Sequence, residues 1–308
     1  MELRTFLGIE SGWRGEGCSR RCRWNSSSFR KSSKMSYMQV DFPNDDSVES
    51  INRRAYDAMA QRDHFLTVPV SPAELANPLA TLDARGWLGP SIRGWRVLCL
   101  AAGGGRQGPL YTAAGADVTV LDISPAMLER DREAAKRFGM KLRIVEGTMR
   151  DLSMFRESEF DLVAHPVSTC YVRDPIEVFS QVARVLRSGG LYISQHKQPV
   201  NLQASLQSRD GSYAIETEIG AAAKSVSAGE TSWLREPNTV EYAHSFEVLL
   251  GGICRSGMVI EDLSEPDHTR PDGTPGSMGH RSRFVPPYIR VKARRAGESE
   301  SPKLVLAF

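Results

Sequence analysis

The stretch RVLCLAAGGGRQGPLYTAAGADVTVLDIS, residues 96–124, decides the fold of this chain. Its apolar run Val97–Leu100 predicts a short parallel strand that is covered on both faces. Gly103, Gly104 and Gly105 follow, and a turn made of glycines lets the backbone approach a ligand closely, because no Cβ intervenes. Val118–Leu121 predict a second strand, and Asp122 at its carboxyl end is positioned to accept hydrogen bonds from ribose hydroxyls. The stretch therefore predicts a binding site for a cofactor that contains a nucleoside.

The composition is that of an ordinary globular protein. The 308 residues are enough for one large α/β domain or two small ones, and 41% of them are hydrophobic and 25% charged. A net charge of +2 and the lack of a basic, aromatic-rich stripe argue against a nucleic acid or a membrane as partner. No apolar run approaches the roughly 20 residues that cross a bilayer. Five scattered cysteines give no disulfide framework and suit a reducing compartment: Cys18, Cys22, Cys99, Cys170 and Cys254. We therefore expect a cytoplasmic protein.

The N-terminal segment differs from the rest. Residues 1–34 hold eight Arg or Lys and three acids, and this composition buries too little apolar surface to fold alone. No second ligand pair follows Cys18 and Cys22 at a suitable spacing, so we expect no metal site. We interpret residues 1–40 as a disordered extension, residues 41–295 as the folded domain, and residues 296–308 as a tail.

Helices and strands are predicted to alternate along the folded domain. The first helix begins near Ser47 and continues to about Phe65, and a short helix follows between Pro72 and Arg85. After Asp122, the predicted helices are 125–138, 175–186 and 245–255, and the predicted strands are 142–145, 160–164, 191–194, 258–263 and 288–293. This alternation implies right-handed βαβ units and a doubly wound parallel sheet with helices on both faces. The weakly periodic residues 195–243 are expected to form a functional insertion.

The order of motifs resembles a known family. Gly103, Gly105 and Gly108 satisfy the dinucleotide fingerprint, but that spacing alone is a weak indication. The succession of VLCLAAGGG, VTVLDIS, VEGTMRDL, FDLVAHPVSTCYVRDP and VARVLRSGGLYIS resembles the class I S-adenosylmethionine-dependent methyltransferases, of the small-molecule, type 11-like kind. The resemblance extends from about residue 56 to 294. It implies a Rossmann-like seven-stranded sheet of order 3-2-1-4-5-7-6, with strand 7 antiparallel, and S-adenosyl-L-methionine as cofactor.

The resemblance also identifies candidate cofactor contacts: Tyr56, Ala101, Gly103, Gly105, Asp122, Ile123, Thr148 and Met149. Arg106 and Gln107 are further candidates, for the methionine carboxylate. The chain departs from the family at three of its usual positions. Cys99 stands where members have an acid that helps to hold the methionine amino group, and Ala101 stands where they have a glycine. Thr148 replaces an Asp that meets the adenine amino group in many relatives.

Methyl transfer is a displacement at a sulfonium, and it needs a general base only when the attacking atom carries a proton. His165 and His196 follow predicted strands at the side of the sheet where ligands bind, so they are the candidate bases or substrate contacts. Tyr171, His244, His268 and His280 are further candidates. The strand before His165 ends in Ala-His-Pro-Val, which disfavours the amine-methylating Asn/Asp-Pro-Pro-Tyr class. We therefore expect a small-molecule acceptor, enclosed by residues 195–243, the first helix and residues 265–283.

Two alternatives remain open from the sequence. One is an NAD(P)-dependent oxidoreductase that uses the Gly103-x-Gly105-x-x-Gly108 loop, although two residues, Ala101 and Ala102, separate the strand from the first glycine. The other is a non-catalytic domain of the methyltransferase type that binds a nucleoside or a partner without turnover. The missing acids at Cys99 and Thr148 support this second alternative.

Overall fold

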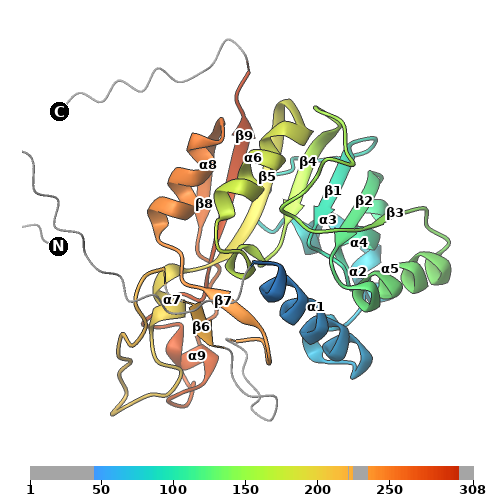
Figure 1. Cartoon of the computed structure of the whole chain (residues 1–308). Coiled ribbons are helices and arrows are strands. Elements are labelled where there is room, and N and C mark those ends of the chain that lie inside the picture. The colour runs from blue at the N-terminus through green and yellow to red at the C-terminus, as the bar shows by residue number, and fades with distance from the viewer. Residues whose placement is uncertain (1–44, 221, 225–234, 298–308) are drawn as a thin grey trace, which may run out of the picture. The chain divides into compact units, whose positions relative to one another are not determined.

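The stretch from Arg96 to Ser124 forms the predicted strand, glycine turn and second strand, and a helix lies between the turn and the second strand. The computed structural model describes residues 45–220, 222–224 and 235–297 (Figure 1). The predicted extension 1–40 lies outside these residues, as does the predicted tail beyond residue 297. No helix within the described ranges is long and apolar enough to cross a bilayer.

Seven strands form the main sheet, in the order β3-β2-β1-β4-β5-β9-β8. Strands β1 to β5 are parallel, whereas β9 lies antiparallel to both β5 and β8. Numbered within this sheet alone, the order is 3-2-1-4-5-7-6 with strand 7 antiparallel, so the predicted topology is confirmed. The strands are β1 (Arg96–Leu100), β2 (Asp117–Asp122), β3 (Arg143–Glu146), β4 (Phe160–His165), β5 (Leu186–Lys197), β8 (Met258–Ser264) and β9 (Tyr288–Arg295).

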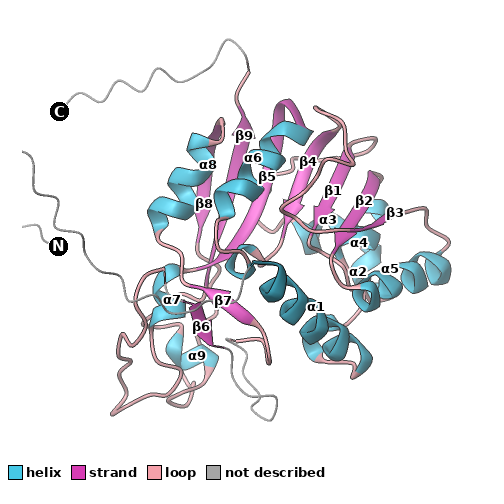
Figure 2. Ribbon diagram, in the orientation of Figure 1, coloured by secondary structure: helices cyan, strands magenta, loops and turns pink. Residues whose placement is uncertain are grey.

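Helices cover both faces of the sheet, as Figure 2 shows. Alternate residues of β1 enter two separate cores: Val97 and Cys99 belong to one, Leu98 and Leu100 to the other. Helices α4 and α5 contribute to the first core, and α6 and α8 to the second. The helices are α1 (Asp45–Gln61), α2 (Pro72–Ala76), α3 (Pro78–Leu82), α4 (Gln107–Ala113), α5 (Pro125–Phe138), α6 (Pro175–Val185), α7 (Pro199–Gln203), α8 (Gly252–Arg255) and α9 (Met278–Arg281).

Shorter elements complete the described chain. Two turns of 3₁₀ helix lie at Phe65–Thr67 and Thr169–Tyr171, and a π-helical turn at Glu247–Gly251 leads into α8. In the predicted insertion 195–243, β6 (Ala222–Lys224) and β7 (Val240–Tyr242) pair antiparallel. Figure 1 shows α7, β6, β7 and α9 grouped beyond the Lys197 end of β5.

Some predicted boundaries differ from the structure. The helix expected between Pro72 and Arg85 is two helices, because Pro78 has no amide hydrogen and Asn77 before it is not helical (φ −141°, ψ 71°). Gly189 and Gly190 were expected to stop a helix, but α6 ends at Val185 and both glycines lie within β5. There the pairing with β4 shifts register between Phe160 and Leu162, a bulge that suits the φ of +70° at Gly189. Strand β5 also continues three residues beyond the predicted end at Ser194.

Candidate active site

The turn after β1 is bound to two carboxylates. The amide of Gly103 donates to Asp122 Oδ2 at 2.8 Å, and the amide of Gly104 donates to Asp131 Oδ2 at 2.9 Å. Gly104 and Gly105 have φ values of +117° and +72°, which favour glycine. Ala101 also has a positive φ, +48°, at the position where the family has glycine. The carboxylates and the glycines together fix the path of the turn.

Gly105→Ala tests how closely this turn must approach α5. A Cβ at Gly105 would lie 2.6 Å from the carbonyl oxygen of Arg130, whereas at Gly139, which has a similar φ of +63°, it would meet nothing within 4 Å. We expect Gly139→Ala to lower the free energy of unfolding by about 1–2 kcal/mol through its φ alone. Gly105→Ala should cost about 1–3 kcal/mol more, because backbone must move. Urea unfolding of both variants measures the difference, and equal losses would contradict the close approach.

Asp122 and Asp131 are both buried. Burial raises the pKa of Asp122 more than the backbone hydrogen bonds from Ser124 and Gly103 lower it. Burial likewise raises the pKa of Asp131 to about 7. Sequence reasoning missed Asp131, although an acid among the buried residues of α5, between Leu128 and Ala134, is a recognisable signal. Asp131 binds the turn from the side away from the pocket and is not among the pocket's lining residues, whereas Asp122 lines the pocket.

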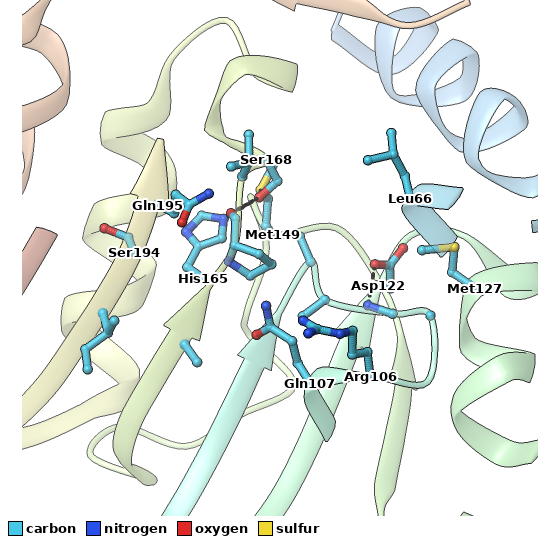
Figure 3. A pocket seen from close by; sticks show the side chains of 18 of the residues that line it. Leu66, Arg106, Gln107, Asp122, Met127, Met149, His165, Ser168, Ser194 and Gln195 are labelled. Atoms are coloured by element: carbon cyan, nitrogen blue, oxygen red, sulfur yellow. Dashed lines mark hydrogen bonds between the residues drawn. The ribbon is translucent and has the colours of Figure 1, made fainter. Parts of the chain in front are cut away.

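A pocket of about 520 Å³ lies along the carboxyl ends of the parallel strands. Of the candidates from the sequence, it is lined by Tyr56, Ala101, Gly103, Arg106, Gln107, Asp122, Ile123, Thr148, Met149, His165 and Tyr171. Gly105, His196, His244, His268 and His280 are not among its lining residues. Figure 3 shows Asp122 and Met127 on one side of the pocket and His165, Ser168 and Gln195 on the other. The pocket therefore connects the glycine turn with the ends of β4 and β5.

The two candidate catalytic histidines have different surroundings. His165 lines the pocket, but its Nδ1 lies 2.7 Å from the Tyr192 hydroxyl and its Nε2 2.6 Å from Ser168 Oγ. His196 is completely buried, with Thr169 Oγ1 and Ser194 Oγ each 2.8 Å from a ring nitrogen. Burial lowers the pKa of both rings to about 3, so both are neutral at physiological pH. The catalytic roles of His165 and His196 stay predictions, and of the two only His165 has access to the pocket.

An acid from α1 lies where the family's adenine-binding acid is missing. Glu49 lines the pocket, and its Oε1 accepts a hydrogen bond of 2.6 Å from Thr148 Oγ1. Arg150 approaches the same oxygen at 3.5 Å. Thr148 has no carboxylate of its own, but its hydrogen bond holds the carboxylate of Glu49 at this part of the pocket. No sequence signal indicated Glu49, because its position depends on how α1 packs.

The far end of the pocket combines tyrosines with a buried ionic cluster. The hydroxyls of Tyr56 and Tyr171 lie 2.8 Å apart, and both residues line the pocket together with Glu236. Lys197 donates to Glu236 and, at 2.6 Å, to Glu241. Arg235 pairs with the other oxygen of Glu241 at 3.1 Å. Burial acts to raise the pKa of Glu236, but the positive charge of Lys197 acts against burial and the pKa stays low. Glu236 is therefore ionised, and its negative charge is balanced by Lys197.

Comparison with known proteins agrees with this geometry. Residues 98–194 match the family model described as a methyltransferase domain. The uncharacterised methyltransferase YbaJ of Bacillus subtilis (strain 168) is 37% identical over 179 residues, which span 57% of this chain and 70% of YbaJ. A phosphatidylethanolamine N-methyltransferase of Cereibacter sphaeroides is 37% identical over 104 residues, 32% of this chain and 49% of that protein.

Solved structures share the fold at lower identity. An S-adenosylmethionine-dependent methyltransferase from Mesorhizobium loti is 23% identical with a TM-score of 0.56, over 72% of this chain and 100% of that one. A 1,6-didemethyltoxoflavin-N1-methyltransferase from Burkholderia thailandensis was solved with 1,6-didemethyltoxoflavin and S-adenosylhomocysteine. It is 17% identical with a TM-score of 0.51, and the match covers 84% of this chain and 94% of that one. The chain belongs to the class I S-adenosylmethionine-dependent methyltransferase family.

Proposed function

We propose that this protein transfers a methyl group from S-adenosylmethionine to a small molecule. The observation that carries the proposal is one pocket that joins the glycine turn and Asp122 to a second region lined by His165, Tyr171 and Glu236. Its volume of about 520 Å³ is within the range of roughly 300–1,000 Å³ typical of small-molecule sites. A cofactor and an acceptor therefore have adjoining places in one cavity.

The residues of the turn fit the cofactor. Asp122 lines the pocket, and a carboxylate oxygen that already accepts one backbone hydrogen bond has a further lone pair for a ribose hydroxyl. Ile123 and Met149 are apolar lining residues for the adenine ring, with Thr148 and Glu49 at its polar edge. Arg106 and Gln107, at the start of α4, line the pocket and are our candidates for the methionine carboxylate, although Arg106 also pairs with Glu74 at 2.6 Å. Cys99 is completely buried and outside the pocket, so we assign it no contact with the amino group.

The chemistry asks little of the protein beyond alignment. The cofactor supplies a sulfonium-bound methyl group with an excellent leaving group, so the enzyme needs to hold the acceptor in line and exclude water. Tyr56 and Tyr171, linked through their hydroxyls, bring α1 and the segment after β4 together beside the pocket. Of the two candidate bases or acceptor contacts, we favour His165 as an acceptor contact, because it lines the pocket beside Ser168 and its pKa of about 3 makes it a weak base. For His196 we propose a supporting role within the core.

Neither alternative gains support. Dinucleotide-binding Rossmann sheets have the strand order 3-2-1-4-5-6, whereas here antiparallel β9 lies between β5 and β8. A non-catalytic binding domain needs no acceptor region, yet the pocket continues well past the turn.

Methyl transfer itself tests the proposal. The protein is incubated with S-adenosylmethionine labelled in its methyl group and with a whole-cell extract, and the label is followed into small molecules, protein, lipid and nucleic acid. We expect label in a small molecule with wild-type protein and none with Asp122→Ala. Label in a macromolecule would contradict the proposed acceptor class. Cofactor binding without any transfer would favour the non-catalytic domain.

Glu49→Gln tests the assigned adenine contact. We expect it to weaken S-adenosylhomocysteine binding about fivefold, because a hydrogen bond to a charged acceptor is worth roughly 1 kcal/mol more than a neutral one. Discrimination against the 6-oxo analogue, S-inosylhomocysteine, should shrink as well. Calorimetric titration measures both ligands. Glu146→Gln is the matched control, since Glu146 ends β3, pairs with Arg53 and is absent from the pocket lining. Equal affinity in the two variants would contradict the contact.

A further inference from the structure

One face of the β5–β9 ladder forms part of the acceptor region. The antiparallel register pairs Gln195 with Arg290 and Lys197 with Tyr288. Because alternate side chains of a strand point to the same face, these four residues lie on one side of the sheet. Gln195, Tyr288 and Arg290 line the pocket, while Lys197 is completely buried beside it.

Lys197 and Arg290 differ in their partners. Lys197 is neutralised by Glu236 and Glu241. Arg290 donates through Nε to Gln195 Oε1 at 2.6 Å, and within the described part of the chain no carboxylate forms an ion pair with it. Burial lowers the pKa of Arg290. Among the described residues Arg290 therefore presents to the pocket a positive charge that has no carboxylate partner.

The neighbours of Arg290 add further donors. Gln195 Oε1 accepts from Arg290, which turns the amide group of Gln195 so that its nitrogen is a donor without a hydrogen-bond partner among the described residues. The Tyr288 hydroxyl makes no hydrogen bond to another residue of the described ranges, and burial together with Glu236 raises the pKa of Tyr288 to about 12, so the hydroxyl keeps its proton. A guanidinium, an amide and a phenol on one face are the groups that bind a carboxylate or a phosphate.

We propose that the methyl acceptor carries an anionic group, a carboxylate or a phosphate, that binds to Arg290 with Gln195 and Tyr288. This inference rests on the proposed methyltransferase function. A cationic acceptor held by Glu236 is the competing possibility, but Lys197 already neutralises that carboxylate. The net charge that the acceptor region offers is thus that of Arg290.

Simple aromatic probes test the anion site without knowledge of the natural acceptor. Benzoate, phenyl phosphate and the neutral benzamide are titrated calorimetrically into the protein, with and without saturating S-adenosylhomocysteine. We expect benzoate or phenyl phosphate to bind at least about tenfold more tightly than benzamide, and the tighter of the two identifies the anion. Arg290→Gln should abolish this preference, and Arg290→Lys should restore part of it.

Lys292→Gln is the matched control. Lys292 lies on the same face of β9, pairs with Glu261 at 3.0 Å and is absent from the pocket lining, so its loss should leave the preference unchanged. Benzamide binding as tightly as both anions, or an anion preference that survives in Arg290→Gln, would overturn the inference. Failure of wild-type protein to bind S-adenosylhomocysteine would instead contradict the proposed function, and the titrations without it still report on the anion site.

Discussion

Replacing Lys197 with methionine is expected to lower the free energy of unfolding by about 3–5 kcal/mol, the loss typical when one partner of a buried ion pair is removed. The Lys197 side chain is completely buried, and the substitution leaves Glu236 and Glu241 without their shared cation. Arg235 still contacts Glu241, but Glu236 loses its Lys197 bond. Urea unfolding at pH 7 measures the loss.

The pH dependence of that loss identifies its cause. Without Lys197, burial raises the pKa of Glu236 above its value in the unfolded chain. A carboxyl with a raised folded-state pKa favours the folded state at low pH and loses that contribution as pH rises through the folded pKa. The deficit of Lys197→Met should therefore be smaller at pH 5 than at pH 8. Lys292→Met removes a partly exposed pair with Glu261 and should cost about 1 kcal/mol or less. Equal losses in the two variants would show that the buried cluster does not hold the fold.

Asp122→Ala is expected to weaken S-adenosylhomocysteine binding by at least about tenfold, or roughly 1.4 kcal/mol. A charge-assisted hydrogen bond contributes about 1.5–3 kcal/mol, and the substitution removes the carboxylate assigned to the ribose. It also removes the acceptor for the Gly103 and Ser124 amides. These amides bind different oxygens of Asp122, so Asp122→Asn keeps an acceptor for only one of them, and thermal unfolding of the ligand-free variants measures how much of the lost affinity comes from the turn. Calorimetric titration measures all variants.

Asp117→Asn is the control for Asp122. Asp117 begins the same strand, is exposed and is absent from the pocket lining. Its replacement should leave the affinity within about twofold of wild type, a change below roughly 0.4 kcal/mol. Wild-type affinity in Asp122→Ala would mean that the ribose binds elsewhere.

Local patterns were enough to predict the strands and the glycine turn around Asp122. The strand before Gly103 and the acid at Asp122 are short-range features, and the backbone geometry of a turn follows from its own residues. The strand order came from the resemblance to the methyltransferase family, and the structure confirms it.

Pocket residues from distant segments could not be predicted in the same way. Glu49, Glu236 and Arg290 come from α1, the segment before β7, and β9, and only tertiary packing brings them to one cavity. The wrong prediction for the end of β5 also affected the interpretation of His196. It was expected just past the end of a strand, but β5 continues to Lys197 and directs the ring into the core.

Binding of the cofactor product is the most direct test of the central claim that the glycine turn and Asp122 form an S-adenosylmethionine site. Purified protein is titrated calorimetrically with S-adenosylhomocysteine and, in parallel, with NADH. The pocket predicts one S-adenosylhomocysteine per chain, binding that is weakened by Asp122→Ala, and no binding of NADH. Binding of NADH alone would favour an oxidoreductase, and binding of neither ligand would contradict a nucleoside-cofactor site at this turn.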